Sequence, residues 1–357
     1  MLSAVLQPFN FIENTYTVAP FGSGLINNTW LAERAGEKYI VQRINQHVFK
    51  TPWDIDENIR QIAAYLQQHY PGYLFTVPLH THTGETLLQH DGHAYRIFTF
   101  IEGSHTYDVL QQPAQAYEAA KQFGRFTKLL GGFNAAQLKV TLPNFHDLSL
   151  RYQQFEAAVA GGSKERHAYA ADLIGSLQKH AGIVQQFEEI KTNPSFKKRV
   201  THHDTKISNV LFDENDKGIC VIDLDTVMPG FFISDIGDMM RTYLASASED
   251  ETDFSKIAIR DEYFDAIVEG YLGEMQFELS APELDAFVYS GKFMIYMQAL
   301  RFLADFLNND VYYGAKYPLH NYNRAANQMV LLEALVDKEQ LFNQKVKAFI
   351  GGHQGTN

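Results

Sequence analysis

One stretch in the second half of the chain constrains its fold and chemistry more than any other. Residues 201–213 read T-H-H-D-T-K-I-S-N-V-L-F-D, so Asp204, Lys206 and Asn209 follow one another at short, fixed intervals. An apolar run then ends in Asp223-Leu224-Asp225, with Asp223 fourteen residues after Asn209. This order predicts a polar loop, a short β-hairpin and an acidic turn.

The side chains of these two turns meet the requirements of phosphoryl transfer. An ionised aspartate such as Asp204 can accept a hydrogen bond from a hydroxyl and aim its oxygen at phosphorus. We expect Lys206, two residues further on, to contact the transferred phosphate. The amide oxygen of Asn209 and the carboxylate of Asp223 are ligands that suit Mg²⁺. Asp225 lies on the same strand face as Asp223, and it is a candidate for a second ligand or for a residue that supports the first.

Two other interpretations of the acidic residues fit less well. A D-x-D pair also occurs in nucleotide-sugar glycosyltransferases, but these require a preceding α/β nucleotide domain, and this chain has β-hairpins there. Residues 213–218 resemble a calcium-binding loop. However, Lys217 stands at a ligand position, and Leu224 stands where the bidentate glutamate belongs. We interpret 213–218 as the turn of the hairpin.

The composition excludes several classes of protein. A formal charge of −12 argues against a nucleic-acid partner, which would require a basic surface. The single cysteine cannot form an intrachain disulfide, and it fits a reducing compartment. The chain has no run of about 18 apolar residues that would span a membrane and no signal-peptide pattern. We therefore expect a cytoplasmic protein with no nucleic-acid or membrane partner, and its oligomeric state stays open.

The hydrophobic period changes near residue 100. Before it, β-type patterns predict strands around a single helix over 54–69. After it, helical periodicity dominates, apart from two short strands within 201–230. The sequence therefore predicts an α+β fold with a small β-rich lobe over 1–100, a hinge at about 99–104, and a larger, mainly helical lobe over 101–357. The other expected strands are 16–21, 22–32, 37–44, 86–88 and 93–100, and the expected later helices are 116–130, 148–159, 165–191 and 252–349.

A glycine pair in the first lobe is a candidate phosphate loop. Gly22-Ser23-Gly24 lies at the junction of the first two predicted strands, where backbone amides can approach a phosphate closely. The chain lacks the P-loop motif and the third glycine of a Rossmann fingerprint. A cation for the phosphates is expected on the third strand, where Gln42 and Arg43 are the candidates. Strand alternation lets only one of them face inward; we favour Arg43, and the choice stays open.

The helical lobe contains three further candidate contacts. His146-Asp147 offers either an imidazole for sugar hydroxyls or a helix start capped by Asp147. Asp235 can hold the amides of residues 201–209, which we call the catalytic loop, or cap a helix, or both. Arg301 lies in a largely apolar helical stretch. It therefore requires a partner, which is either an acidic side chain or the substrate and its phosphate.

Together these segments resemble the aminoglycoside-phosphotransferase-like kinases. Within that superfamily the chain is most similar to the kinases that phosphorylate the anomeric hydroxyl of N-acetylglucosamine (GlcNAc) and N-acetylgalactosamine (GalNAc). The catalytic loop carries the resemblance to the superfamily, and the sugar assignment depends on the other segments. The matching segments are residues 22–29, 41–45, 142–147, 202–213, 221–230, 235–238 and 300–307.

The resemblance implies a protein-kinase-like bilobal fold that binds ATP at the hinge, together with Mg²⁺. It makes Asp204 the catalytic base, with Lys206 beside it, and makes Asn209 and Asp223 the metal ligands. The implied nucleotide contacts are Gly22, Ser23, Gly24, Gln42, Arg43, Phe100 and Glu102. The implied sugar contacts are His146, Asp204, Arg301 and Tyr317.

The expected activity is therefore Mg²⁺-dependent transfer of the γ-phosphate of ATP to the anomeric hydroxyl of an N-acetylhexosamine. One alternative is a kinase of the same fold that acts on another small alcohol, such as an aminoglycoside, choline or homoserine. Another is a pseudokinase that binds its ligand without chemistry, because Gln42-Arg43 stands where a lysine is usual. The sequence leaves open the epimer, the phosphorylated hydroxyl, and the choice between ATP and GTP.

Overall fold

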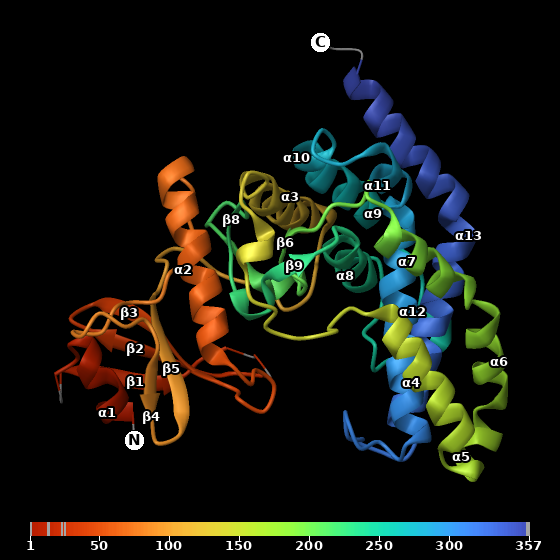
Figure 1. Cartoon of the computed structure of the whole chain (residues 1–357), viewed down its shortest axis with the longest axis horizontal. Helices are drawn as coiled ribbons and strands as arrows, with labels where there is room; N and C mark the ends of the chain where they lie inside the picture. Colours follow the sequence, from red (N-terminus) through yellow and green to blue (C-terminus); the bar gives the residue numbers. More distant parts are fainter. Residues whose placement is uncertain (1, 13–14, 23, 25, 355–357) are drawn as a thin grey trace. The chain divides into compact units, whose positions relative to one another are not determined.

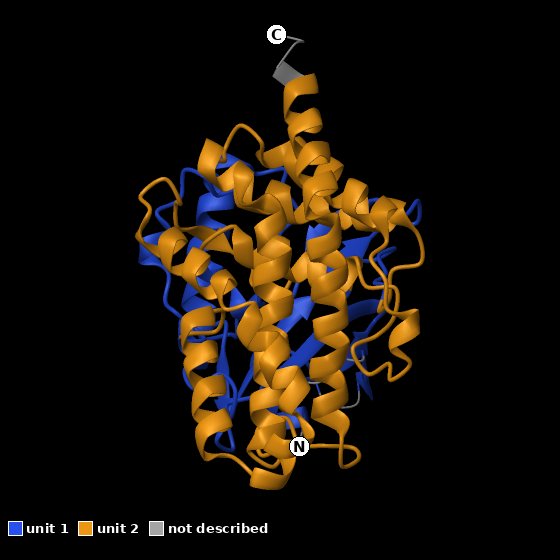
Figure 2. Cartoon of the chain, turned by 90° about the vertical axis from the view of Figure 1, so that its right-hand side faces the viewer, with its two compact units in different colours: residues 1–107, 129–143, 208–229 blue, residues 108–128, 144–207, 230–357 orange. Residues whose placement is uncertain are grey.

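The chain folds into two units, which Figure 2 shows in different colours. The computed structural model describes residues 2–12, 15–22, 24 and 26–354. Unit 1 comprises residues 1–107, 129–143 and 208–229, and unit 2 comprises residues 108–128, 144–207 and 230–357. The division falls within the catalytic loop, so Asp204 belongs to unit 2, whereas Asn209 and Asp223 belong to unit 1. The lobe boundaries near residue 100 stay a prediction.

An antiparallel five-stranded sheet forms the centre of unit 1, in the order β1-β2-β3-β5-β4 (Figure 1). Its strands are β1 (Tyr16–Pro20), β2 (Asn28–Arg34), β3 (Glu37–Ile44), β4 (Leu88–His90) and β5 (His93–Thr99). The prediction for β3 is confirmed. The strand expected over 86–88 begins two residues later, and the one expected over 22–32 begins only at Asn28.

The two faces of this sheet have different neighbours because side chains alternate along each strand. Val41 of β3 points to the face where it joins a buried apolar cluster with helix α1 (Leu2–Leu6). Gln42 lies directly opposite Arg96 of β5, so both point to the other face. Arg43, one residue further on, lies on the same face as Val41.

A helix and a hairpin complete the regular structure of unit 1. Helix α2 (Pro52–His69) has a proline in its first turn, where the missing amide costs nothing, and it packs against the short 3-10 helix η4 (Leu224–Thr226). Strands β7 (Val210–Phe212) and β8 (Gly218–Val221) pair as the predicted hairpin. In the turn, Asp213 Oδ1 accepts hydrogen bonds from the amides of Asn215 and Lys217 at 2.8 and 2.9 Å.

Unit 2 is predominantly helical, as the spacing of apolar residues after residue 100 predicted. Its helices are α3 (Pro113–Leu129), α4 (Leu148–Gly161), α5 (Lys164–Tyr169), α6 (Ala171–Lys179), α7 (Gly182–Thr192), α8 (Ile233–Tyr243), α9 (Asp261–Ile267), α10 (Gly273–Met275), α11 (Ala281–Asp285), α12 (Phe287–Leu307) and α13 (His320–Gln354), with a π-helical turn η6 (Val268–Leu272). The short strand β6 (Arg199–Thr201) leads into the catalytic loop, and the short strand β9 (Met228–Gly230) spans the boundary from unit 1 to unit 2.

Helix α12 is the core element of unit 2 (Figure 1). It packs against α13, α8 and α4. Nearly every side chain along it is apolar and buried, which is the pattern of a helix enclosed by protein. Arg301 and Asp305 are therefore exceptional on this helix, and both are considered below.

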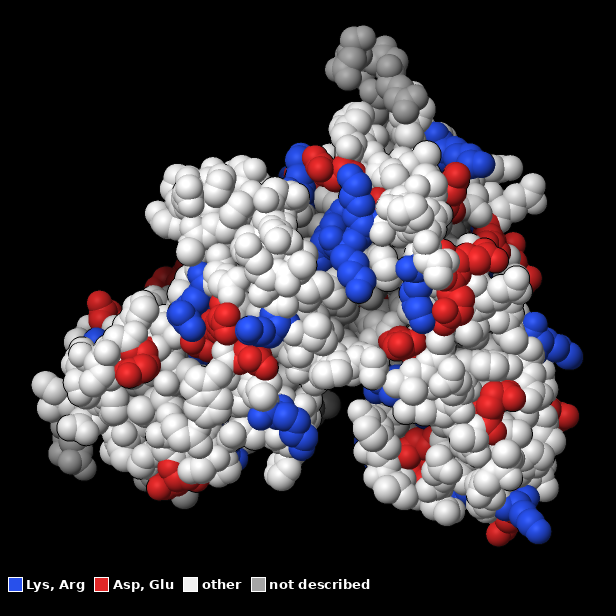
Figure 3. All heavy atoms as spheres, in the orientation of Figure 1, with Lys and Arg blue, Asp and Glu red and all other residues white. Residues whose placement is uncertain are grey.

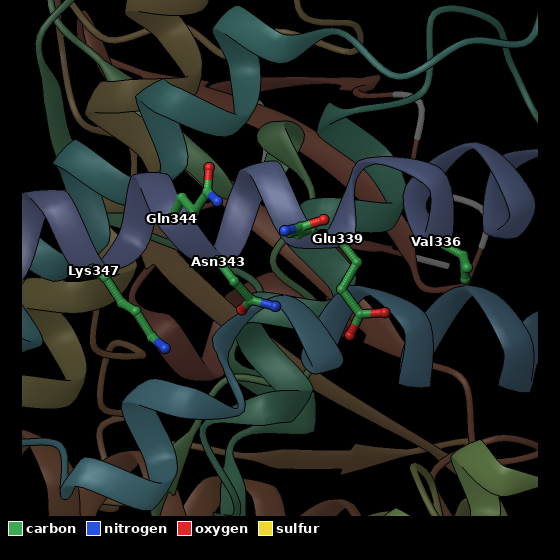
Figure 4. A pocket seen from close by; sticks show the side chains of 6 residues that line it. Val336, Glu339, Asn343, Gln344 and Lys347 are labelled. Atoms are coloured by element: carbon green, nitrogen blue, oxygen red, sulfur yellow. The ribbon is translucent and has the colours of Figure 1, made fainter.

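The surface carries mixed charge and a hollow on the last helix. Basic and acidic side chains are interspersed on the face shown in Figure 3. None of the helices in the described part of the chain is both long and apolar enough to cross a bilayer. A hollow of about 540 Å³ lies on α13, and no predicted site residue lines it (Figure 4). Its lining residues are Val336, Glu339, Gln340, Asn343, Gln344 and Lys347.

Candidate active site

The glycine pair lies in the connection between β1 and β2, where a phosphate loop was expected. The amide of Phe21 donates to Thr29 O at 3.0 Å and closes the end of this hairpin. Gly22 has φ +80°, a conformation that favours glycine, and Gly24 is exposed. Ser23 lies outside the described residues. We call residues 21–28 the glycine loop.

The residues that follow β5 lie close to the start of the glycine loop. The rings of Phe100 and Phe21 form an edge-to-face pair with centroids 6.1 Å apart. The amide of Phe100 donates to Lys38 O at 3.0 Å. Glu102 is exposed, and its Oε2 lies 3.3 Å from Lys38 Nζ. The structure thus brings Phe100 beside the loop, whereas Glu102 is paired with a lysine of β3.

A buried ion pair lies on the sheet face of Gln42. Arg96 Nη2 is 2.5 Å from Asp225 Oδ1, and the two residues are only 2% and 1% exposed. Arg96 Nε and Nη2 also donate to Gln42 Oε1 at 3.0 and 2.8 Å. The second carboxylate oxygen of Asp225 accepts a hydrogen bond from Asn27 Nδ2 at 2.7 Å. Both oxygens of Asp225 therefore have protein partners.

These contacts revise two of the expected roles. Asp225 was expected to be a second metal ligand or a residue that supports the first, and its contacts with a guanidinium and an amide favour the supporting role. Arg43 was favoured as the inward cation, yet it lies on the opposite sheet face, where its guanidinium donates to Asn28 Oδ1 at 2.7 and 3.2 Å. The cation beside Gln42 is Arg96, which was not among the predicted site residues. The sequence feature that could have indicated it is a single charged residue within the otherwise apolar centre of β5.

The two remaining candidate metal ligands lie at the open end of the β7–β8 hairpin. Val210 pairs with Val221, and the amide of Ile222 donates to Asn209 O at 2.9 Å. Asp223 follows directly with φ 59° and turns the chain into η4. Amide and carboxylate oxygens fit Mg²⁺, which typically takes one or two protein ligands together with phosphate oxygens. No group of three His, Cys, Asp or Glu side chains suited to a metal occurs among the residues that the structure describes.

The catalytic loop is held from helix α8 by a buried carboxylate. Asp235 Oδ2 accepts from the amide of His202 at 3.1 Å, and Oδ1 accepts from the amide of His203 at 2.7 Å. His203 has φ 67°, which is unfavourable for a residue other than glycine and so depends on such restraints. The predicted scaffold role of Asp235 is confirmed. The capping role is wrong, because the helix already begins at Ile233 and its N-cap is Phe232.

A second carboxylate of α8 fixes the other side of the loop. Asp238 Oδ2 accepts from the amide of Thr205 at 2.8 Å, and Tyr243 OH donates to Thr205 O at 2.7 Å. Burial raises the pKa of Asp235 to about 7, and the two loop amides oppose this rise. Burial also raises the pKa of Asp238, while Arg241 counteracts it. Backbone atoms on both sides of Asp204 are therefore tied to one helix.

Asp204 itself stays partly exposed between these anchors. Its Oδ2 lies 3.1 Å from Lys206 Nζ, with the two side chains 23% and 45% exposed. The structure thus brings together the two predicted catalytic residues. That Asp204, Asn209 and Asp223 serve one reaction stays a prediction, because they belong to different units.

His146 lies beside the catalytic loop at the start of α4. Asp147 caps this helix as predicted, because its Oδ1 accepts from the amide of Leu150 at 3.1 Å. The half-buried His146 ring stacks on Phe145 with centroids 4.3 Å apart and lies 5.5 Å from the His203 ring. Burial holds the pKa of His146 well below its ordinary value of 6.5. The nearby positive charges act in the same direction, and they belong to His203, Arg301, Arg241 and Arg151.

Arg301 has no acidic partner among the described residues, so that expectation is wrong. Its Nη1 donates to Gln298 Oε1 at 2.8 Å, and its guanidinium lies 5.9 and 5.4 Å from the ring centroids of Tyr312 and Tyr313. Tyr317 lies between α12 and α13 and is 38% exposed. The substrate alternative for Arg301 therefore stands.

Comparisons with known proteins agree with this geometry. A family model described as the phosphotransferase enzyme family (APH) matches residues 17–278. A microcompartment-associated aminopropanol kinase matches with TM-score 0.62 and 14% identity over 97% of this chain and 100% of that one. An aminoglycoside phosphotransferase from Alicyclobacillus acidocaldarius matches with TM-score 0.60 and 12% identity over 95% of each chain.

A third solved structure is similar over a slightly smaller share of the chain. It is a spectinomycin phosphotransferase in complex with ADP and spectinomycin, with TM-score 0.54 and 14% identity over 91% of this chain and 93% of that one. At such identities the similarity establishes the fold. The protein-kinase-like α+β fold expected from the sequence is thereby confirmed.

Proposed function

Because the chain belongs to the phosphotransferase enzyme family, we propose that it transfers the γ-phosphate of ATP to the anomeric hydroxyl of an N-acetylhexosamine such as GlcNAc or GalNAc. Kinases of this family use ATP and Mg²⁺. The observation that carries the proposal is the anchored catalytic loop. Its backbone is fixed to Asp235 on one side of Asp204 and to Asp238 on the other, while Asp204 stays accessible.

Asp204 is the residue that orients the acceptor. Its carboxylate accepts the hydrogen bond of the attacking hydroxyl and keeps that oxygen in line with the phosphorus. In a loose transition state this alignment matters more than basicity. Lys206, 3.1 Å away, is placed to contact the transferred group as charge redistributes over its oxygens. A rigid loop is the physical requirement for both roles, and α8 supplies it.

The nucleotide contacts are assigned to unit 1. The backbone amides of the glycine loop approach the phosphates, and Phe100 with Phe21 offers an aromatic edge to the base. Binding of ADP by the similarly folded spectinomycin phosphotransferase supports a nucleotide site of this kind. Asn209 and Asp223 would hold Mg²⁺, which supplies positive charge to the phosphate oxygens.

The charges around His146 support an uncharged acceptor. Besides burial, the charges that lower the pKa of His146 are all positive. Burial also lowers the pKa of Arg151, and the charge of Arg301 lowers it further. Arg241 has carboxylate partners in Asp238 and Glu249, but Arg301 has none among the described residues. An ammonium group beside Arg301 and Arg151 would meet repulsion from these two cations. N-acetylation removes that charge from an amino sugar, which favours an N-acetylhexosamine over the cationic amino alcohols and aminoglycosides.

A matched pair of sugars tests this reasoning. The protein is incubated with ATP, Mg²⁺ and an acceptor panel that contains GlcNAc, GalNAc, glucosamine, choline, homoserine and an aminoglycoside. Release of ADP gives kcat/KM, and NMR locates the phosphate. Two like charges ~10 Å apart at an effective dielectric constant of ~20 repel by about 1.7 kcal/mol, so glucosamine should be at least roughly tenfold poorer than GlcNAc.

The outcomes of the panel separate the alternatives. A sugar 1-phosphate formed from GlcNAc or GalNAc supports the proposal. Turnover of a cationic acceptor alone would contradict the charge argument and assign the chain to another small-alcohol kinase. Magnesium-dependent ATP binding without product from any acceptor would indicate a pseudokinase.

A further inference from the structure

We propose that Arg96 of β5, rather than a residue of β3, is the cation that contacts the phosphates of the bound nucleotide. This inference rests on the proposed function, because it concerns the same nucleotide site. The observations that carry it are the register of the sheet, the contacts of the guanidinium, and its connection to the glycine loop.

The register places Arg96 and Arg43 on opposite faces of the sheet. Arg96 lies opposite Gln42, on the face that carries Asp225. Arg43 continues the row of Val41, which belongs to the apolar cluster with α1. A cation that lies near Asp225 and the candidate metal ligand Asp223 must therefore come from the sheet face that carries Arg96.

The contacts of Arg96 orient it and leave one nitrogen available. Nε and Nη2 are engaged by Gln42 and Asp225, and the guanidinium carbon lies 5.1 Å from the ring centroid of Phe98. Nη1 is buried and has no hydrogen-bond partner among the residues that the structure describes. A buried donor of a charged group requires an acceptor. A phosphate oxygen is the acceptor for which a planar guanidinium is best suited.

The ion pair is linked directly to the glycine loop. Asp225 Oδ2 accepts from Asn27 Nδ2 at 2.7 Å, and Asn27 Oδ1 accepts from the amide of Asn45 at 2.9 Å. Asn27 is thereby held between the acidic turn and the end of β3. Arg96, Asp225 and Asn27 form one chain of contacts, which we call the Arg96 relay. The relay ends in the loop whose amides are assigned to the same phosphates.

The same geometry explains why a neutral residue occupies the usual cation position on β3. Gln42 Oε1 accepts two N–H bonds from Arg96, a task that a lysine or an arginine could not perform. A lysine at residue 42 would instead place a second positive charge against Arg96. Gln42 therefore positions the cation, and β5 supplies it.

Nucleotide binding by the full chain, measured by calorimetry without any acceptor, tests the proposal. The ligands are Mg²⁺-ADP, which carries phosphates, and adenosine, which carries none. Arg96→Met alone would leave the buried Asp225 without its cation and can unfold the chain. The variant for the test is therefore Arg96→Met with Asp225→Asn, and Asp225→Asn alone is its matched reference. Arg43→Met tests the rival arginine, and thermal unfolding verifies that each variant is folded.

The proposal predicts that the double variant binds ADP at least roughly tenfold more weakly than Asp225→Asn alone, with equal affinity for adenosine. Arg43→Met should bind both ligands as the wild type does. Equal ADP affinity in the double variant and its reference would overturn the proposal, as would a loss confined to Arg43→Met. If the wild type binds neither ligand, the proposed function fails as well. If the wild type binds ADP and the double variant matches its reference, only the role of Arg96 fails.

Discussion

Replacing Asp235 by asparagine should disable the catalytic loop without touching any residue that meets substrate. The carboxylate accepts from two buried amides, at 3.1 and 2.7 Å. An asparagine can accept from one of them, but its NH₂ group faces the other. One buried amide then loses its acceptor, which costs about 1–3 kcal/mol. We therefore expect Asp235→Asn to lower the free energy of unfolding by about that amount.

The fall in kcat of Asp235→Asn should be larger than the loss of folded protein alone would cause. His203 holds φ 67° next to Asp204, and its amide makes the shorter of the two bonds. Once released, the loop can relax and move the Asp204 carboxylate. A displacement of ~1 Å can lower kcat about a hundredfold. We expect kcat to fall by roughly one to two orders of magnitude, with little change in ADP affinity.

Asp305→Asn is the matched control for this experiment. Asp305 is also buried, and its two oxygens accept from the amides of Tyr312 and Tyr313 at 2.7 and 2.9 Å. It should lose similar stability in urea unfolding while kcat stays near the wild-type value. Wild-type kcat in Asp235→Asn, or equal losses of kcat in both variants, would show that the Asp235 anchor does not position Asp204.

Three further predictions concern unit 2. Gly230→Ala places a methyl group against the His203 ring and the Thr201 hydroxyl. The free energy of unfolding, measured in urea, should fall by about 1–3 kcal/mol. Wild-type stability of this variant would contradict the packing. The pKa of His146 is lowered in the folded protein, so the neutral ring should contribute fully to the free energy of unfolding above pH 6.5. This contribution should be lost as the pH falls through the lower folded pKa. A ring found protonated by NMR at pH 6.5 would refute this prediction. Arg301→Met should raise the acceptor KM roughly tenfold while ADP affinity stays constant, and an unchanged KM would exclude the substrate role.

Local patterns in the sequence predicted the parts of the site that depend on neighbours along the chain. The β7–β8 hairpin, the cap at Asp147 and the anchoring role of Asp235 follow from short-range spacing or side-chain chemistry, and the structure confirms them. The α+β class follows equally from the change of period near residue 100.

The sequence could not reveal the pairings that depend on strand register. Gln42 and Arg96 are far apart in the chain and meet only because β3 pairs with β5 in one particular register. A shift of one residue would have placed Arg43 on that face instead. The engagement of Asp225 by Arg96 and Asn27 likewise depends on tertiary contacts, so the spacing of Asp223 and Asp225 alone suggested a second metal ligand.

The Asp204→Asn variant is the decisive test of whether Asp204 aligns an acceptor hydroxyl for phosphoryl transfer. Turnover with the best acceptor and ATP is measured together with calorimetric affinity for Mg²⁺-ADP. We expect turnover to be abolished while nucleotide binding remains largely intact. Near-wild-type turnover in this variant would exclude the aligning role of Asp204.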